Sequence, residues 1–195
     1  MRIRKFNYNS ILLSLLLVIL SISCNNNGDK HLTLQKKSLA DHIGDTFRIQ
    51  NLLDSAGNQI QLDFSKSDVT IIDFWFNECP PCINEMKQFP EVLAGKEGKI
   101  SVISISINQF WLWKPTLTNH TGRFSFLSNN TPNWTQYVLK TSQDEKLKNE
   151  ISADRQQEIE ALYNITFFPA FFVLDKKGII RERPVSAVEY IKEYK

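Results

Sequence analysis

Two cysteines three positions apart, directly after an apolar run, constrain this chain more than any other feature. The segment is Phe74-Trp75-Phe76-Asn77-Glu78-Cys79-Pro80-Pro81-Cys82, and the residues from Val69 to Phe76 are typical of a buried strand. Pro80 suits the first position of a helix, where a backbone N–H is not needed. If a helix begins there, both sulfurs lie on one face within bonding reach. The spacing predicts a reactive cysteine pair at a strand-to-helix junction.

The predicted helix start gives the two cysteines different roles. Cys79 would lie at the helix N-terminus, where free N–H groups and the positive end of the dipole favour a thiolate. The thiolate is the form that attacks disulfides. We therefore expect Cys79 to be a partly exposed nucleophile with a lowered pKa. Cys82 should be more buried and should resolve a mixed disulfide by attacking Cys79. A purely structural disulfide over so short a loop would constrain the unfolded chain little.

The two prolines between the cysteines affect the redox balance. Neither Pro80 nor Pro81 has an N–H, so a thiolate at Cys79 lacks two local donors. Weaker stabilisation of the reduced form lowers the reduction potential, and about 30 mV corresponds to about 1.4 kcal/mol for this couple. The prolines therefore favour a protein that reduces its partners.

The first 23 residues have the pattern of a signal peptide. Arg2, Arg4 and Lys5 precede an apolar run at 11–20 that is short for a membrane span. Cys24 follows small residues, and this pattern resembles a bacterial lipoprotein signal with a lipidated cysteine. We expect a signal peptide at 1–23, a lipid-anchored tether at 24–40 and one folded domain at 41–195. A retained signal anchor or plain secretion would also place the domain outside the cytoplasm, where disulfides persist.

The charge balance gives no support for nucleic-acid binding. The chain has 23 Lys and Arg against 21 Asp and Glu, a net charge of +2. Three of these cations belong to the leader, which leaves 20 basic and 21 acidic residues and a net charge of −1. A domain of this charge without a basic stripe lacks the electrostatic footprint of a nucleic-acid-binding protein.

Strand and helix patterns alternate along the folded domain. Strands are expected at 47–53 and 59–64 around a turn at 54–58, and at 69–76, 100–107, 171–174 and 179–183. Helices are expected at 80–94, where Pro90 should kink or shorten the helix, at 154–163 from a capping box of Asp154 and Gln157, and from 186 onward. This order predicts an α/β fold with a mixed central sheet flanked by helices, an N-terminal β-hairpin and a central insertion.

The insertion, residues 108–149, has a less regular pattern. We expect a helix at 109–120, a short strand at 124–127 and a helix at 132–140. Trp111, Trp113 and Trp134 could line a groove for an apolar partner. Such residues more often form the core, which is the interpretation we favour.

Taken in order, these motifs resemble the TlpA/ResA type of thiol–disulfide oxidoreductases, which have a thioredoxin-like fold. The resemblance covers roughly residues 43–194. It rests on Ile71-Ile72-Asp73-Phe74-Trp75, the Cys-Pro-Pro-Cys, Glu85, Tyr163-Asn164-Ile165, Phe168-Pro169 and Phe171-Phe172-Val173-Leu174-Asp175 with Gly178. It implies an exported, membrane-tethered enzyme that exchanges a dithiol for a disulfide on protein substrates.

The resemblance also assigns roles to single residues. Asp73 would be a buried general base near Cys82, because a buried carboxylate has a raised pKa. Glu85 matches the active-site glutamate of these proteins. Pro169 would be a cis proline facing the cysteines across the substrate groove, and Phe168 would narrow that groove or grip apolar groups. A satisfied strand-end Asp73, an exposed Glu85 and a trans Pro169 are the plainer alternatives.

Glu78 departs from the family pattern, which commonly has Trp before the first cysteine. A carboxylate pointing inward there would raise the pKa of Cys79 by like-charge repulsion, and the loss of an aromatic surface would change partner preference. A solvated loop residue is the alternative.

The resemblance implies no bound cofactor. The expected partners are exported cysteine-containing proteins as substrates and an upstream thiol protein or membrane donor as the source of electrons. A copper-binding or delivery module on the same fold is the main alternative. Only His31, His42 and His120 could assist the cysteines, and they lack ligand spacing. A peroxiredoxin-like peroxidase is less favoured, because Phe76 stands where those proteins have Thr.

Overall fold

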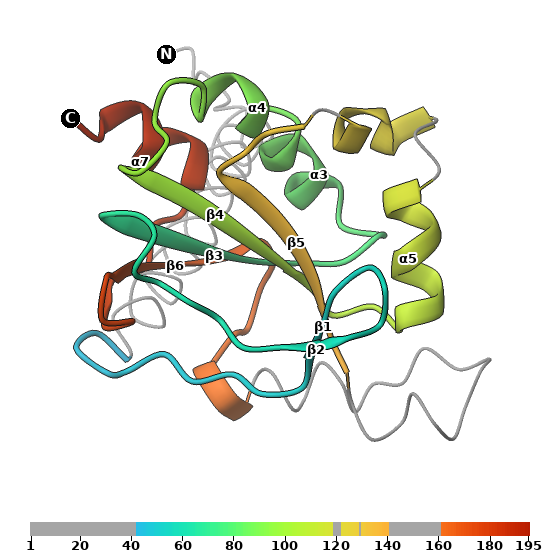
Figure 1. Cartoon of the computed structure of the whole chain (residues 1–195), viewed down its shortest axis with the longest axis horizontal. Helices are drawn as coiled ribbons and strands as arrows, with labels where there is room; N and C mark the ends of the chain where they lie inside the picture. The colour runs from blue at the N-terminus through green and yellow to red at the C-terminus, as the bar shows by residue number, and fades with distance from the viewer. Residues whose placement is uncertain (1–41, 119–121, 129, 141–160) are drawn as a thin grey trace, which may run out of the picture. The chain divides into compact units, whose positions relative to one another are not determined.

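Seven strands form one mixed sheet in the computed structural model, which describes residues 42–118, 122–128, 130–140 and 161–195 (Figure 1). The strand order is β2-β1-β5-β4-β3-β6-β7. The bounds are Leu52–Leu53 for β1, Gln59–Ile60 for β2, Val69–Trp75 for β3, Ile100–Ser106 for β4, Trp134–Leu139 for β5, Ala170–Asp175 for β6 and Ile180–Glu182 for β7.

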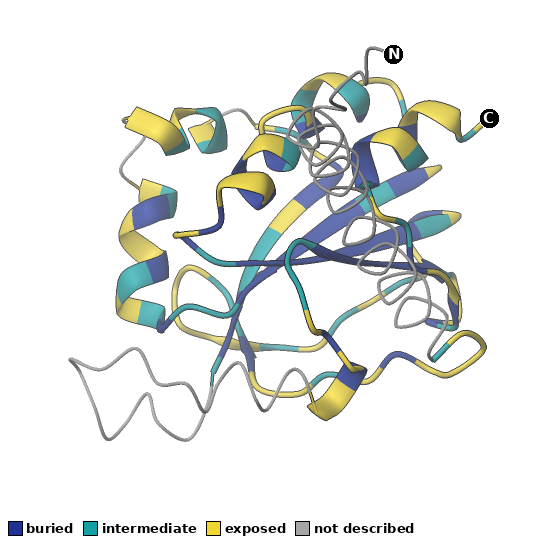
Figure 2. Ribbon diagram, turned by 180° about the vertical axis from the view of Figure 1, so that it is seen from behind, coloured by how far each residue is buried: buried dark blue, intermediate teal, exposed yellow. Residues whose placement is uncertain are grey.

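The strands β3, β4 and β5 are parallel and form the centre of the sheet, with β6 antiparallel to β3. Both faces of the central strands are covered, which explains the nearly continuous apolar runs in β3 and β6 (Figure 2). Because side chains alternate along a strand, Ile71 and Trp75 enter one core while Ile72 and Phe74 enter the other. The predicted mixed sheet is confirmed.

The helices labelled in Figure 1 gather on one face of the sheet, whereas a helical turn at 161–163 contributes Tyr163 to the core on the other face. Their bounds are Pro80–Met86 for α3, Phe89–Val92 for α4, Phe110–Thr118 for α5 and Ala187–Glu193 for α7, and a 3₁₀ helix, η1, spans Gly122–Ser128. Each of α3, α4, α5 and α7 contributes a buried apolar residue, such as Met86, Phe89, Trp113 and Val188, to one hydrophobic cluster that also contains Ile71, Trp75, Cys79 and Cys82. This packing places the start of α3 over the end of β3.

Two short helices, α3 and α4, occupy the stretch predicted as helical at 80–94, so the helix is shortened and not kinked. Pro90 is the cause. Its ring nitrogen has no proton to donate to the carbonyl of Met86, so α3 ends at that residue. Pro90 then lies in the first turn of α4, where its missing N–H does no harm.

Two predictions in the insertion are wrong. Residues 124–127 form part of the 3₁₀ helix η1 rather than a strand, and residues 134–139 form the strand β5 rather than a helix. In β5 the residue types agree with the structure, because Trp, Thr, Tyr and Val all favour strands. The predicted helix at 109–120 is confirmed as α5, apart from its last two residues, which lie outside the described part. Trp113 and Trp134 are buried as expected, whereas Trp111 is 43% exposed.

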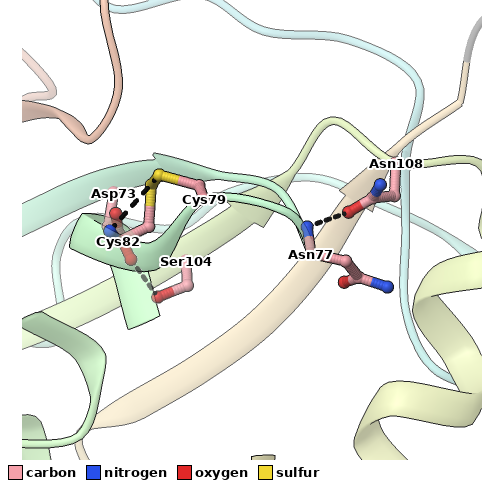
Figure 3. The surroundings of a disulfide bond; sticks show 6 residues. All are labelled: Asp73, Asn77, Cys79, Cys82, Ser104 and Asn108. Carbon is pink, nitrogen blue, oxygen red and sulfur yellow. Dashed lines mark hydrogen bonds between the residues drawn. A yellow bond between two sulfur atoms is a disulfide. The ribbon is translucent and has the colours of Figure 1, made fainter. Parts of the chain in front are cut away.

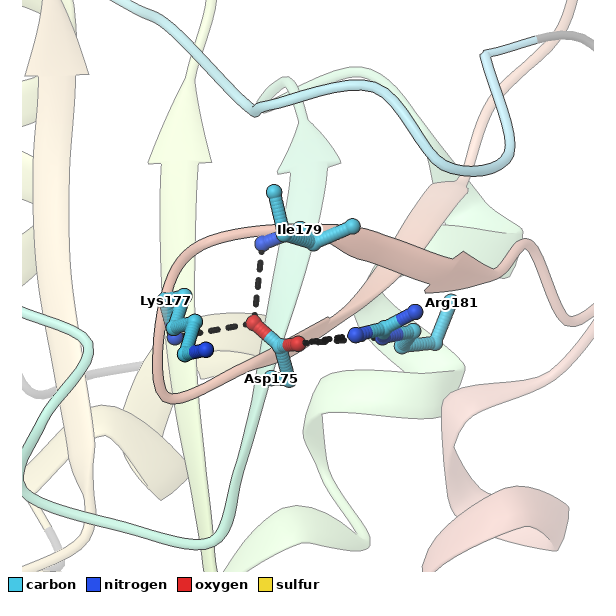
Figure 4. Close-up of polar contacts among 4 residues, drawn as sticks. All are labelled: Asp175, Lys177, Ile179 and Arg181. Atoms are coloured by element: carbon cyan, nitrogen blue, oxygen red, sulfur yellow. Dashed lines mark hydrogen bonds and ion pairs between the residues drawn. The ribbon is translucent and has the colours of Figure 1, made fainter.

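Both predicted hairpins are present. The first is shorter than predicted, because only β1 and β2 pair around the turn at 54–58. In the second, the Asp175 carboxylate organises the turn between β6 and β7 (Figure 4). Its Oδ1 accepts from the backbone N–H groups of Lys177 and Ile179 at 2.8 and 3.0 Å, and its Oδ2 pairs with Arg181. The positive φ of 75° at Gly178 completes the reversal.

Some predictions lie outside the described residues. These are the signal peptide at 1–23, the tether at 24–40 with Cys24, and the capping box at Asp154 and Gln157. Within the described ranges, no helix is long and apolar enough to cross a bilayer.

Candidate active site

The predicted cysteine pair is joined as a disulfide at the N-terminus of α3 (Figure 3). The Sγ atoms of Cys79 and Cys82 are 1.98 Å apart and their Cα atoms 5.3 Å apart. Cys79 is the N-cap residue, with extended backbone angles, and its carbonyl accepts the first helical hydrogen bond from Ile83 N–H at 3.1 Å. The prediction that a helix starting at Pro80 brings the sulfurs into bonding reach is confirmed.

Cys79 is more buried than expected. It is 3% exposed in the disulfide, and Cys82 is fully buried. Cys79 is the more exposed of the two cysteines, as predicted, but the expectation that it is partly exposed is wrong. Beside the pair, Phe76 and Phe168 lie edge to face with their ring centroids 5.3 Å apart, and both pack against the core cluster that contains the cysteines.

One backbone donor remains for the Cys79 sulfur after the two prolines. An N-cap side chain can accept from the second or third helical N–H. Pro81 removes the second, and the third, Cys82 N–H, donates to Cys79 Sγ at 3.3 Å. Pro80 and Pro81 themselves are exposed. The loop therefore stabilises a sulfur at position 79 with one donor where other sequences could supply two.

Asp73 is fully buried on β3, among the residues that surround the disulfide (Figure 3). Asp73 is two residues from both Ile71 and Trp75. Its side chain therefore points to the same face of the sheet as theirs, which is the face of the two cysteines. Burial raises the pKa of Asp73 to about 7, the Ser104 hydroxyl opposes this by donating to Oδ2 at 2.8 Å, and the Glu85 charge raises the pKa further. A carboxyl group with this pKa can accept or release a proton near neutral pH.

A second polar network holds the loop that carries Cys79. The Asn77 N–H donates to Asn108 Oδ1 at 2.7 Å (Figure 3). Asn77 Nδ2 donates to Thr116 Oγ1 of α5 at 3.0 Å. The Ser106 hydroxyl also donates to Asn108 Oδ1, at 3.1 Å. The end of β3 is thus tied to the end of β4 and to the insertion. The sequence analysis missed these residues, and its one relevant signal was the alternation of Ser with Ile and Val in 100–107.

Glu85 is half-buried and its contact is with another helix. Its Oε2 accepts from the Val188 N–H at 3.0 Å, in the first turn of α7. The N-cap residue Ser186 accepts from Glu189 N–H, so the two side chains together satisfy two of the free donors of this helix. The alternative of an exposed Glu85 is therefore wrong, and a role in exchange stays a prediction.

The remaining predicted residues surround the pair in different ways. The Phe168–Pro169 peptide bond is cis, as the resemblance implied. Phe168 meets Phe76, which precedes Cys79 by three positions, so the predicted groove residue and the cysteine loop are brought together. Glu78 is exposed, so the inward orientation that would act on Cys79 is not present. Its effect on partner choice stays a prediction.

Metal binding is the alternative function for the cysteine pair. Of the three histidines, His42 bonds the Asp45 carboxylate, whereas His31 and His120 lie outside the described residues. In the part of the chain that the structure describes, no group of three or more His, Cys, Asp or Glu side chains is placed to hold a metal ion.

Several solved bacterial proteins are similar in structure to this chain. A thiol:disulfide interchange protein from Bacteroides sp. is 20% identical, with a TM-score of 0.55 over 79% of this chain and 87% of that one. The thioredoxin domain of a thiol-disulfide oxidoreductase from Bacteroides vulgatus is 19% identical, with a TM-score of 0.53 over 77% and 92%. A domain of a possible thiol-disulfide isomerase from Cytophaga hutchinsonii is 18% identical, with a TM-score of 0.52 over 78% and 89%. These similarities show the predicted thioredoxin-like fold.

A family assignment comes from the sequence itself. No curated protein matches the chain. The protein-family model described as "AhpC/TSA family" matches residues 43–183, which is well over half of the chain and includes the disulfide, Asp73 and Pro169. The chain therefore belongs to the AhpC/TSA family, as a thioredoxin-like oxidoreductase.

Proposed function

We propose that this protein is an exported, membrane-tethered oxidoreductase that reduces disulfides of other exported proteins with the Cys79/Cys82 dithiol. The observation that carries the proposal is the cysteine pair at the N-terminus of α3, on the same side of the sheet as the buried Asp73. This arrangement supplies a nucleophile, a second thiol and a proton acceptor without a bound cofactor.

The first step forms a mixed disulfide. The Cys79 thiolate attacks one sulfur of the partner's disulfide, a Cys79–partner bond forms, and the partner's S–S bond breaks. The electron pair of the broken bond leaves with the second partner sulfur, which takes a proton from solvent. The Cys82 N–H, 3.3 Å from the Cys79 sulfur in the disulfide, is placed to stabilise the thiolate before the attack.

The second step releases the partner. Asp73 takes the proton of the Cys82 thiol, and the Cys82 thiolate attacks the Cys79 sulfur. The Cys79–Cys82 bond forms while the Cys79–partner bond breaks, and the partner sulfur leaves as a thiolate that is then protonated. Two electrons have passed to the partner, and an upstream thiol protein or membrane donor restores the dithiol. The buried pair favours intramolecular closure, because the two sulfurs are held together.

The direction of electron flow can be tested by the reduction potential. We expect equilibration of the purified protein with dithiothreitol and glutathione buffers to give a potential more negative than about −200 mV. Pro81→Ala adds an N–H at the second helical position, which can donate to a Cys79 thiolate, so its potential should rise by about 30 mV. Pro80→Ala is the matched control, because an N–H at the first helical position points away from the cap.

Two results would contradict the reducing role. One is a wild-type potential above about −150 mV, which is in the range of strong oxidants. The other is an equal rise for the two proline variants, which would mean that helix stability and not the second donor sets the potential.

Export and lipidation can be tested at Cys24. In a bacterial host grown with labelled palmitate, the wild type should carry the label and sediment with membranes, and Cys24→Ser should lose the label. Cys82→Ser is the control, because it removes a cysteine while keeping the leader intact. Label that persists in Cys24→Ser, or a wild type without any label, would disprove the lipid anchor.

A further inference from the structure

A chain of buried polar groups ends at the Asp73 carboxylate. The Trp134 indole N–H donates to Ser104 Oγ at 2.9 Å, and the Ser104 hydroxyl donates to Asp73 Oδ2 at 2.8 Å. An indole N–H can only donate, so the Ser104 oxygen must accept from it. The single hydroxyl proton of Ser104 is then directed to the carboxylate. The chemistry of Trp134 therefore fixes the direction of both hydrogen bonds.

The sheet and the aromatic core hold these groups in place. Ser104 is fully buried and lies opposite Asp73 in the parallel register of β3 and β4. The Trp134 ring meets Phe89 of α4 edge to face at 5.3 Å and stacks with Phe126 of η1 at 6.3 Å. A ring fixed on two sides cannot turn its N–H away from Ser104 without repacking the core.

The other groups around Asp73 do not replace this donor. Glu85 on α3 carries a negative charge, Cys82 lies on the same side of the sheet, and Phe171, opposite Asp73 on β6, is apolar. Asp73 Oδ1 is buried and has no hydrogen-bond partner among the described residues. Burial and Glu85 therefore disfavour the ionised carboxylate, while Ser104 favours it.

We propose that Ser104 is a positioning residue for Asp73, and that its hydroxyl, oriented by Trp134, sets the pH range in which Asp73 accepts the proton of Cys82. This inference rests on the proposed function, because it concerns the second exchange step. Ser104 touches no reacting sulfur in this role. It acts through the carboxylate, by the hydrogen bond that stabilises the charged form.

Two measurements on the full chain test the proposal. Carbon-13 NMR of the oxidised protein follows the Asp73 carboxyl without interference from titrating thiols at the pair. Rapid mixing of the reduced protein with oxidised glutathione gives the pH profile of the second step, in which glutathione leaves.

In Ser104→Ala both midpoints should rise by about one pH unit or more. Trp134→Phe keeps an aromatic ring at this position but loses the N–H that orients Ser104, so a smaller rise of both midpoints is expected. Ser104→Thr keeps the hydroxyl and should restore the wild-type midpoints.

Ser106→Ala is the matched control. Ser106 is also a fully buried serine of β4, but its hydroxyl donates to Asn108 and not to Asp73. An unchanged Asp73 midpoint in Ser104→Ala, or an equal rise in Ser106→Ala, would overturn the proposal. If Ser104→Ala does not fold, Trp134→Phe decides, and no rise in its midpoints counts against the proposal. A wild type that never releases glutathione would instead refute the proposed function, while the NMR titration would still report on Ser104.

Discussion

Replacement of Cys82 by serine is expected to stop exchange at the mixed disulfide. Cys79 can still attack a partner, but the variant lacks the Cys82 sulfur, which is bonded to the Cys79 sulfur in the disulfide and would release the partner. With a disulfide-containing protein as substrate, Cys82→Ser should accumulate a covalent adduct that survives denaturation and disappears with excess dithiothreitol. Turnover should fall by about a thousandfold or more, as when one member of a unit of catalytic residues is lost.

The reciprocal variant identifies the nucleophile. Cys79→Ser should form little adduct, because Cys82 is fully buried whereas Cys79 is 3% exposed. Both variants are best made in a Cys24→Ser background, so that the third cysteine of the chain cannot form the adduct. Mass spectrometry of the denatured adduct locates the bond. If Cys79→Ser traps partners as well as Cys82→Ser does, the assignment of nucleophile and resolving thiol is wrong.

Much of the site could be predicted from the sequence because its signals are local. A run of apolar residues predicts β3, Pro80 predicts the start of α3, and the spacing of Cys79 and Cys82 then brings the sulfurs together within one helical turn. The turn beginning at Asp175 likewise depends on neighbours within six residues. Such features need no knowledge of which strands pair.

The features that were missed depend on distant pairing. Ser104 bonds Asp73 across a separation of 31 residues, and Trp134 bonds Ser104 across 30. The alternation of Ser and Ile in 103–107 predicts that Ser104 and Ser106 share a face, but only the register of β3 and β4 shows which one meets Asp73. The contact of Phe168 with Phe76, three residues before Cys79, likewise joins segments that are far apart in the chain.

The insertion was mispredicted for a related reason. In β5, strand propensity and tertiary pairing agree, since Trp134 to Val138 pair in parallel with β4. The polar residues Thr135 and Gln136 weaken the alternating pattern, because β5 lies near the edge of the parallel strands and only part of its surface is covered. In η1, Phe124 and Phe126 suggested a strand by alternation, whereas a 3₁₀ helix places Phe124 against Trp75 and Phe126 against Trp134.

Asp73→Asn is expected to stabilise the oxidised protein in a pH-dependent way. Burial raises the pKa of Asp73 from 3.8 in the unfolded chain to about 7 in the folded protein. Between these values the folded state keeps a proton that the unfolded state has lost, so the free energy of unfolding falls as pH rises. The fall approaches about 1.4 kcal/mol per pH unit, or about 4 kcal/mol in all. Asparagine carries no charge, so the free energy of unfolding of the variant does not fall in this way as pH rises.

The stability difference between variant and wild type should therefore be small near pH 4, grow up to about pH 7 and stay constant above it. Urea unfolding at a series of pH values measures it. Asp68→Asn is the control, because Asp68 lies just before β3 but is exposed and pairs with Lys176. If the increase in the free energy of unfolding of Asp73→Asn does not change with pH, Asp73 has the same charge in the folded and the unfolded states.

The same variant should exchange disulfides more slowly although it is more stable. The variant lacks the carboxylate that we propose as the acceptor of the Cys82 proton, and loss of a general base lowers a rate by on the order of a hundredfold. The defect should lie in the release of the partner and not in its capture, because the attack by Cys79 does not need Asp73. Rapid mixing with oxidised glutathione separates the two steps. If the variant is more stable and equally fast in both steps, Asp73 destabilises the fold and takes no part in exchange. A slow second step in a stabilised protein would instead identify the missing carboxylate as the base.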